Sequence, residues 1–295
     1  MKVLSLYIPT GLVVVLVSVA VLLYFSGCVA VPRDAVVVSG AKDLAVQREA
    51  VTCSPDLEFQ SAQLNEDGID PDGFSVVSWN SHRGTHRDWR RDLVSLGSGA
   101  DIILLQEAAV APIQDAQVDL FANQWLMATA FQLEDGDIGV LSAARVTPEV
   151  YCVSREPEPL FKIPKIGLAA AYSLTGMDTR LLVVNIHMVN FTFSAVAVDR
   201  QFDSLKNIIL NHDGPVIIAG DFNTWNNGRE ELVQRRMSEL DMTQVSFDPD
   251  HRVMFLNRTV DGIYYRGLEV TKSLSHEVDS SDHNPLEVHF RLTSG

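Results

Sequence analysis

Polar side chains that could bind a cation or transfer a proton follow several apolar runs of this 295-residue sequence. The clearest case is Gly220-Asp221-Phe222-Asn223 after the run at 216–219, where a carboxylate and a carboxamide stand two positions apart, on one side of a strand end. The same arrangement recurs beside other apolar runs, at Asn80, Gln106-Glu107, His187, Asp261 and Asp282-His283. Together, carboxylate, amide and imidazole groups can hold a hard cation, activate water and donate a proton.

Each of these positions, taken alone, has an ordinary structural explanation. An Asp-x-Asn pair commonly caps a turn. His187 could be a hydrogen-bonded core histidine, and Gln106-Glu107 could be a strand end that turns into solvent. Burial of so many polar groups costs free energy unless they serve one another or a ligand. It is therefore the complete ordered set that indicates an active site.

Apolar periodicity predicts the elements that must position these groups. Strands are expected at 74–79, 101–105, 125–132, 138–144, 168–174, 181–186, 216–220, 260–265, 269–272 and 285–292. Helices are expected at 87–96, 111–124 and 196–211, and from a capping box at 227–230 to residue 240. Many strands, few helices and several tight hairpins predict two packed sheets covered on the outside by helices.

The net charge of −15 argues against a protein that grips long nucleic acid, because that affinity comes mostly from Lys and Arg on phosphates. It does not exclude a nuclease, since a bound divalent cation inverts the local charge of an acidic cleft. A hydrophobic content of 46% is enough for a sizeable core.

Three cysteines, Cys28, Cys53 and Cys152, are too few for a disulfide framework or a zinc site. The odd count allows at most one bridge, and Cys53–Cys152 is the favoured pair if Cys28 is otherwise used. Three unpaired thiols are an equally good interpretation.

The N-terminal segment 1–27 is predicted to be a membrane anchor or a signal segment. No charged residue occurs from Val3 to Phe25, and a helix of about 23 residues would be about 34 Å long, which is sufficient to cross a bilayer. Its strictly apolar part is nearer the length of a signal-peptide core. Phe25-Ser26-Gly27-Cys28 also resembles a lipoprotein cleavage box, so lipidation of Cys28 is an alternative.

The following segment, 28–73, is predicted to be a polar tether, with one short strand at 35–38 and turn signals at 65–68 and 70–73. The catalytic domain is then expected to span 74–295.

The ordered set of Trp79-Asn80, Gln106-Glu107, Asn185-x-His187, Gly220-Asp221-Phe222-Asn223, Asp261 and Ser281-Asp282-His283 resembles the endonuclease/exonuclease/phosphatase superfamily. That superfamily includes DNase I-like nucleases, inositol polyphosphate 5-phosphatases and neutral sphingomyelinases. The resemblance covers about 74–292, and the stretches 138–144 and 185–191 look closer to its bacterial YafD-like branch. It implies an α/β fold, a four-layer α/β/β/α sandwich of two mostly antiparallel sheets flanked by helices, and metal-dependent hydrolysis of phosphate esters.

The resemblance also implies roles for individual residues. Glu107 matches the carboxylate that holds the metal, with Asn80 beside it and Asp282 as a second acidic contact. The expected cofactor is Mg²⁺, with Mn²⁺ as the alternative.

Proton transfer is assigned by the same resemblance. Asp221 matches the carboxylate that orients or deprotonates the attacking water, and Asn223 would fix that water and a phosphate oxygen. His283 is the candidate acid/base, with Asp261 as the partner that orients it, and His187 would contact the phosphate or assist the leaving group. The division of proton transfer between Asp221 and His283 stays open.

One position departs from the abasic-site endonucleases of the superfamily, which carry an acidic residue where this chain has His82. This departure disfavours DNA repair. His82 and Arg83 lie in a polar, basic segment that could contact substrate phosphate or could be a solvated loop, and Asn190 is a further candidate for substrate binding. Weaker candidates for phosphate contact are Arg145, Arg155, Lys162 and Lys165.

The sequence therefore predicts a Mg²⁺-dependent phosphoesterase that hydrolyses a phosphodiester by in-line attack of water. Alternatives are a membrane-tethered, sphingomyelinase-like lipid phosphodiesterase and an inactive protein that binds a phosphate ligand. The expected partners are a phosphoester, in nucleic acid or a phospholipid head group, and a membrane through residues 3–25. No protein partner is indicated, and a monomer is expected.

The expected location is the bacterial inner membrane, with a single N-terminal anchor and a periplasmic catalytic domain. The alternatives are a lipoprotein attached through Cys28 and a catalytic domain that faces the cytoplasm.

Overall fold

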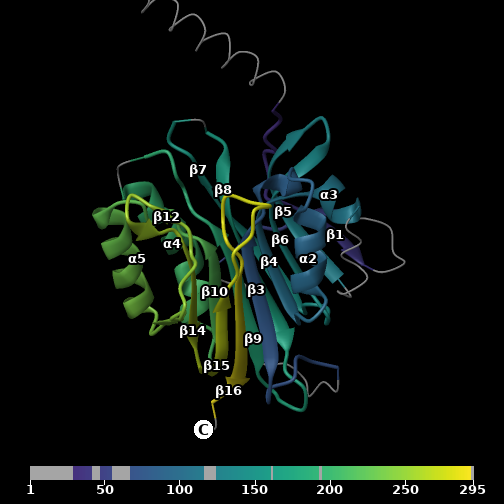
Figure 1. Ribbon diagram of the computed structural model, residues 1–295, viewed down its shortest axis with the longest axis vertical. Helices are drawn as coiled ribbons and strands as arrows, with labels where there is room; N and C mark the ends of the chain where they lie inside the picture. Colours follow the sequence, from purple (N-terminus) through teal and green to yellow (C-terminus); the bar gives the residue numbers. More distant parts are fainter. Residues whose placement is uncertain are drawn as a thin grey trace, which may run out of the picture.

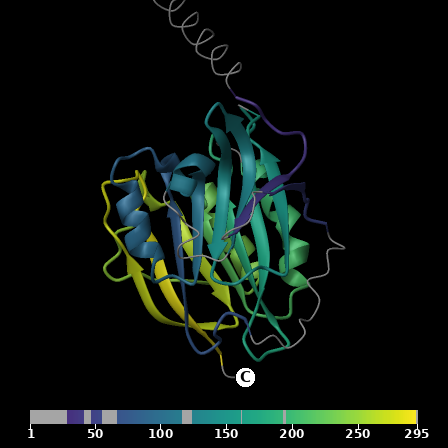
Figure 2. The same ribbon diagram turned by 90° about the vertical axis from the view of Figure 1, so that its right-hand side faces the viewer.

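A computed structural model describes residues 29–41, 47–54, 67–115, 124–160, 162–192 and 195–293. Two β-sheets stack face to face, and helices cover their outer faces (Figures 1 and 2). Three apolar clusters separate the four layers: one between the sheets, and one between each sheet and its helices. The fold is therefore the four-layer α/β/β/α sandwich that the sequence predicts.

The larger sheet has eight strands. In spatial order they are β15 (Leu268–Ser275), β16 (Leu286–Leu292), β3 (Phe74–Asn80), β4 (Ile102–Ala109), β6 (Gly136–Ala144), β5 (Gln124–Leu133), β1 (Val36–Ala41) and β2 (Gln47–Ala50). Every neighbouring pair is antiparallel except β3 and β4, which are parallel.

The smaller sheet has six strands. Their spatial order is β11 (Thr243–Gln244), β14 (Asp261–Arg266), β10 (Val216–Asp221), β9 (Arg180–His187), β8 (Pro164–Ser173) and β7 (Val150–Pro157). Here only β9 and β10 are parallel. A separate hairpin is made of β12 (Met254–Phe255) and β13 (Arg258–Thr259). The apolar periodicity of the sequence did not predict β7, β2 or the short strands β11 to β13.

The helices are α2 (Trp89–Gly97), α3 (Val110–Asp115), α4 (Val196–Leu210) and α5 (Asn227–Glu239), with a 3-10 turn η1 at His82–Gly84. The cap of α5 is Asn226, whose side chain accepts from the Arg229 amide, so the predicted capping box is one residue out of register. The helix predicted at 111–124 is observed only to Asp115. Residues 116–123 lie outside the described part, and Gln124 already belongs to β5.

Each parallel pair is joined by a helix that crosses back over the sheet, as parallel strands require. The crossover helix is α2 between β3 and β4, and α4 between β9 and β10. The carboxyl ends of parallel strands meet at one edge. Asn80 there pairs with Gln106, and Asp221 pairs with His187. The fold therefore gathers the polar ends of four strands that are far apart in sequence.

Part of the segment expected to be a polar tether, 28–73, lies within the domain. Strand β1 pairs with β5, and Val37 and Val38 are buried. The physical reason is the run of three β-branched residues at 36–38, which packs well in a sheet. Residues 42–46 and 55–66, the predicted anchor or signal segment 1–27, and Cys28 lie outside the described residues. Within the described part of the chain, no helix has the length and apolar character needed to span a membrane.

A disulfide joins Cys53 to Cys152, which are 99 residues apart in sequence. Backbone hydrogen bonds reinforce this junction, because the Cys53 amide donates to the Val153 carbonyl and the Val153 amide donates to the Val51 carbonyl. The bridge fastens the chain that leaves β2, in one sheet, to β7 in the other.

We expect replacement of both Cys53 and Cys152 by Ser to lower the free energy of unfolding by about 2–4 kcal/mol, since the bridge restricts a long loop of the unfolded chain. Chemical denaturation of the full chain in detergent measures this change. The control is Cys28→Ser, which leaves the bridge intact. Equal stabilities of the double variant and the control would contradict the expectation.

Candidate active site

The predicted site residues lie where the two sheets meet. The Asn80 side chain, on β3 of the larger sheet, donates to Asp221 Oδ2, on β10 of the smaller sheet, over 3.2 Å. Gln106 Nε2 likewise donates across the sheets to Asn185 Oδ1, over 2.7 Å. All four side chains are buried. These two bonds pair buried polar groups across the sheets, although Gln106 Oε1 is buried without a hydrogen-bond partner.

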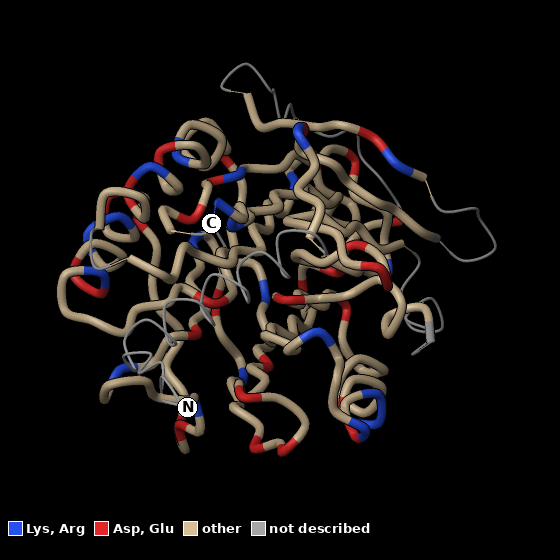
Figure 3. The backbone as a smooth tube through the Cα atoms, turned by 90° about the horizontal axis from the view of Figure 1, so that it is seen from above, with Lys and Arg blue, Asp and Glu red and all other residues tan. Residues whose placement is uncertain are grey.

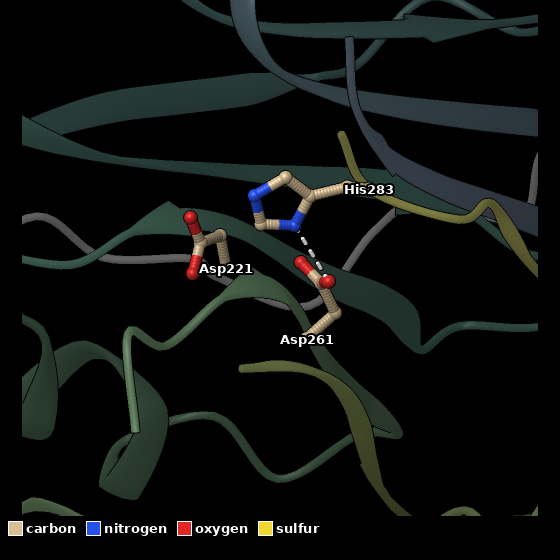
Figure 4. Close-up of side chains that lie close together, drawn as sticks. All are labelled: Asp221, Asp261 and His283. Carbon is tan, nitrogen blue, oxygen red and sulfur yellow. Dashed lines mark hydrogen bonds and ion pairs between the residues drawn. The ribbon is translucent and has the colours of Figure 1, made fainter. Parts of the chain in front are cut away.

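Asp221, Asp261 and His283 form the most compact group at this edge (Figure 4). One ligand atom from each lies within 4.8 Å of the others. His283 Nδ1 is 2.7 Å from Asp261 Oδ2, and the other ring nitrogen faces the side on which Asp221 lies (Figure 4). Trp79 Nε1 donates to the His283 carbonyl over 3.0 Å, which holds the loop before β16 in place.

The charges around His283 favour its protonated form. Burial of the ring opposes protonation, but the carboxylates of Asp261, Asp221 and Asp282 outweigh it and raise the pKa of His283 to about 10. Burial raises the pKa of Asp221, and the charge of His283 partly offsets that effect. In the metal-free protein, His283 is therefore an imidazolium between two carboxylates at neutral pH.

The backbone around Asp221 is tightly constrained. Gly220 has a φ of +144°, and a Cβ atom built there would lie 1.9 Å from the Ile186 carbonyl oxygen, so only glycine fits. Asn223, with a φ of +49°, donates its amide to Asp221 Oδ1 over 2.9 Å and its side chain to the Met188 carbonyl over 3.0 Å. These contacts fix the orientation of the Asp221 carboxylate.

Glu107 lies on a β-bulge of β4 with a φ of +48°. It lines a cavity of about 180 Å³ together with Arg83, Lys165 and His187. Bulges commonly re-aim a side chain next to an active site, and this one turns Glu107 out of the ladder toward the cavity.

The His187 ring contacts a lysine in this cavity. Its Nε2 lies 2.7 Å from Lys165 Nζ. Burial, then the charges of Lys165 and His283, lower the pKa of His187 well below its usual value. His187 Nε2 is also 3.5 Å from Asp221 Oδ2 and 3.9 Å from Glu107 Oε1.

Lys165, one of the weaker candidates for phosphate contact, lies in this cavity beside His187. Burial lowers its pKa, and the charges of Glu107 and Asp221 partly restore it. Of the three candidates ranked beside it, Arg145 and Arg155 donate to backbone carbonyls and Lys162 is exposed. The sequence signal for Lys165 was weak: one charged residue at the start of an otherwise apolar strand.

The three predicted metal ligands do not form a preassembled cluster. Among the described residues, Asp221, Asp261 and His283 are the group of His, Cys, Asp or Glu side chains close enough to share an ion, and neither Glu107 nor Asp282 belongs to it. Asp282 is mostly exposed, with Oδ1 3.0 Å from His82 Nδ1.

A hard cation nevertheless fits beside Glu107. Mg²⁺ is usually held by one or two carboxylates, several waters and substrate phosphates. The half-exposed Glu107 carboxylate follows Gln106, the register partner of Asn80. In the Asp221, Asp261 and His283 group, by contrast, His283 Nδ1 and Asp261 Oδ2 are already paired with each other.

The other predicted substrate contacts are placed at the same edge. Arg83 lines the Glu107 cavity. His82 shares η1 with it and pairs with Asp282. Asn190 follows β9, and its side-chain oxygen accepts from Trp225 Nε1 over 3.0 Å.

Buried polar residues that the sequence analysis did not single out hold the loop after β9. Arg229 donates to the carbonyls of Val189, Thr192 and Asn223. Gln201 donates to the His187 carbonyl over 3.0 Å and accepts from the Val189 amide over 3.1 Å. The burial of Gln201 could have been predicted from the sequence, since this residue stands three positions after Val198 on the apolar face of α4.

We expect His283 to stabilise the metal-free protein in a pH-dependent way. Its pKa rises from about 6.5 in the unfolded chain to about 10 in the folded protein. The stabilisation is thus fully present below about pH 6.5 and is lost as pH rises through about 10. The difference in free energy of unfolding between the wild type and His283→Ala, measured in EDTA, should shrink over this range. A pH-independent difference would show that the ring is not held protonated.

Comparison with known proteins agrees with this geometry. Residues 77–283 match the model of the endonuclease/exonuclease/phosphatase family. A UPF0294 protein of Vibrio cholerae is 34% identical over 226 residues, which cover 76% of this chain and 80% of that protein.

Solved structures share the fold at low identity. An endonuclease/exonuclease/phosphatase from Beutenbergia cavernae aligns with a TM-score of 0.56 and 18% identity, over 76% of this chain and 72% of that one. The human Nocturnin catalytic domain aligns with a TM-score of 0.57 and 19% identity. The alignment covers 77% of this chain and 96% of that domain. Members of the matched family are generally phosphoester hydrolases and typically use divalent metal ions. On its sequence match and its fold, this chain belongs to the endonuclease/exonuclease/phosphatase family.

Proposed function

We propose that this protein is a divalent-cation-dependent phosphodiesterase. The observation that carries the proposal is the joining of the His283–Asp261 pair with Asp221, Glu107 and Lys165 at one edge of the fold. This arrangement provides the Asp221 carboxylate, a protonated imidazole and two further charged groups within one site. Hydrolysis of a phosphate ester needs these same functions.

Glu107 would hold the cation, with Asn80 and Asp282 as further oxygen donors, and Mg²⁺ or Mn²⁺ suits this set. When bound, the cation would neutralise charge on the phosphoryl oxygens. Lys165, and Arg83 at the mouth of the same cavity, would add positive charge toward the phosphate.

Asp221 is the better candidate for the general base. Its pKa is raised, whereas His283 is already protonated at neutral pH and so cannot accept a proton there. The Asn223 amide and the Asn80 side chain donate to the Asp221 carboxylate and fix its orientation. His283 would donate a proton toward the leaving oxygen, and Asp261 on Nδ1 would keep the ring oriented.

We place the protein at the bacterial inner membrane, anchored through residues 3–25, with the catalytic domain in the periplasm. The Cys53–Cys152 bridge supports the periplasmic side, because disulfides persist in oxidising compartments and are rare in the cytosol.

Long nucleic acid is the less favoured substrate. Seen from above, Lys and Arg positions are interspersed with Asp and Glu positions along the helices and loops (Figure 3), and the net charge of the chain is −15. Tight binding of long nucleic acid depends on a surface rich in Lys and Arg.

We expect the full chain, purified in detergent, to hydrolyse bis-p-nitrophenyl phosphate with Mg²⁺ and to lose this activity in EDTA. Glu107→Gln and His283→Ala should each lower kcat by about 100-fold or more, since each removes a group that acts on the reacting phosphate. Release of p-nitrophenol measures the rate.

Matched controls are available in the same chain. His289 also pairs with a carboxylate, with Nε2 2.7 Å from Glu287 Oε1, and lies on β16 outside the site. His289→Ala and the exposed Glu231→Gln should leave the rate unchanged. Phosphate binding without turnover would contradict the proposal and favour an inactive binding protein.

A further inference from the structure

Large apolar side chains are exposed around the end of the domain that carries the site. Met254, Phe255 and Leu256, in the β12–β13 hairpin, are 66%, 57% and 64% exposed. Leu160, in the turn between β7 and β8, and Phe191, after β9, are also exposed. These last two segments touch, because Glu158 accepts hydrogen bonds from the amides of Asn190 and Phe191. We call these five exposed residues the apolar rim.

The apolar rim is continuous with the catalytic groups. A groove of about 800 Å³ has Asn223, Asp282 and His283 at one side and the rim residues Phe191, Phe255 and Leu256 at another. Its remaining lining residues are Asn190, Thr192, Trp225, Val253 and Val260. A ligand whose phosphate reached His283 would therefore have apolar surface beside it.

The chain enters the domain at this same end. Ala30 exchanges two backbone hydrogen bonds with Gln132, of 3.0 and 2.7 Å. The adjacent Phe131 lines the cavity that contains Glu107 and His187. In both views the segment that begins the described chain rises at the end where the β7–β8 turn lies (Figures 1 and 2).

The uncharged apolar stretch of the sequence runs from Val3 to Phe25 and stops about five residues before Ala30. Five extended residues reach at most about 18 Å. A bilayer that held this stretch would therefore lie close to the apolar rim. This placement favours a lipid surface as the occupant of the rim.

Resting on the proposed function, we propose that the apolar rim enters the surface of a lipid bilayer, and that the phosphodiester hydrolysed at His283 belongs to a lipid of that bilayer. Exposed apolar patches next to a binding groove commonly mark such contacts. In this arrangement the head-group phosphate reaches the catalytic edge while the apolar part of the lipid lies along the groove.

A depth measurement tests the contact without using catalysis. The full chain carrying Cys28→Ser and Phe255→Cys, labelled with the fluorophore NBD, is reconstituted in phosphatidylethanolamine and phosphatidylglycerol vesicles that contain a spin-labelled phospholipid. The matched control carries the label at Leu210→Cys, a similarly exposed apolar position at the end of α4. We expect a blue shift and strong quenching at position 255 and neither at 210. Equal quenching at the two positions would overturn the contact.

A turnover measurement tests the substrate class. The Leu160→Ser/Met254→Ser variant changes two rim residues that line neither the groove nor the Glu107 cavity. We expect it to lower the ratio of vesicle phospholipid hydrolysis, followed by phosphorus NMR, to bis-p-nitrophenyl phosphate hydrolysis by about tenfold, since less apolar surface is buried in the bilayer. An unchanged ratio would overturn the inference.

Two further outcomes separate this inference from the proposed function. Hydrolysis of the soluble ester without hydrolysis of vesicle phospholipids, or with preferential hydrolysis of an oligonucleotide, would overturn the lipid substrate and leave the phosphodiesterase standing. Turnover of no phosphodiester, with position 255 still quenched, would overturn the proposed function and leave the bilayer contact standing.

Discussion

The structure depends on hydrogen bonds between its two sheets, at one edge of the interface where the sheets pack. The sheets pack through apolar faces, yet at one edge hydrogen bonds link them: Asn80 to Asp221, Gln106 to Asn185, and His283 to Asp261. Each bond joins a residue of the larger sheet, or of the loop that leads into it, to a residue of the smaller one. A relative shift of the sheets would leave several buried polar groups without partners, at a cost of about 1–3 kcal/mol each. The stability of the packing and the geometry of the site therefore rest on the same contacts.

Charge compensation explains how an acidic chain keeps carboxylates buried here. Asp221 and Asp261 flank the imidazolium of His283, and Lys165 faces Asp221 and Glu107. An isolated buried carboxylate would be protonated, whereas paired carboxylates stay available for chemistry. Burial, and then the charges of Lys165 and His283, lower the pKa of His187, whereas at His283 the carboxylates outweigh burial and raise the pKa. Groups whose pKa values are driven apart in this way are typical of acid/base catalysis.

The N-terminal part of the domain connects the site to its surroundings. Strand β1 and the Cys53–Cys152 bridge fasten the incoming chain to the two sheets, and the first described residues pair beside the Glu107 cavity. The apolar rim lies at the same end of the domain. The point where the described chain begins, the exposed apolar side chains and the candidate site therefore lie at one end of the molecule.

The sequence alone determined the strands that end in polar residues and the types of those residues. Apolar runs such as 216–219 are local patterns, and the burial of a strand depends mainly on its own composition. Tertiary structure decided which groups meet. Several contacts join segments that are far apart in the chain. They are the contact of Lys165 with His187, the hydrogen bonds of Arg229 to the loop after β9, the pairing of β1 with β5, and the disulfide between Cys53 and Cys152. No local period encodes these pairings, because they follow from strand order and from the register in which the two sheets pack.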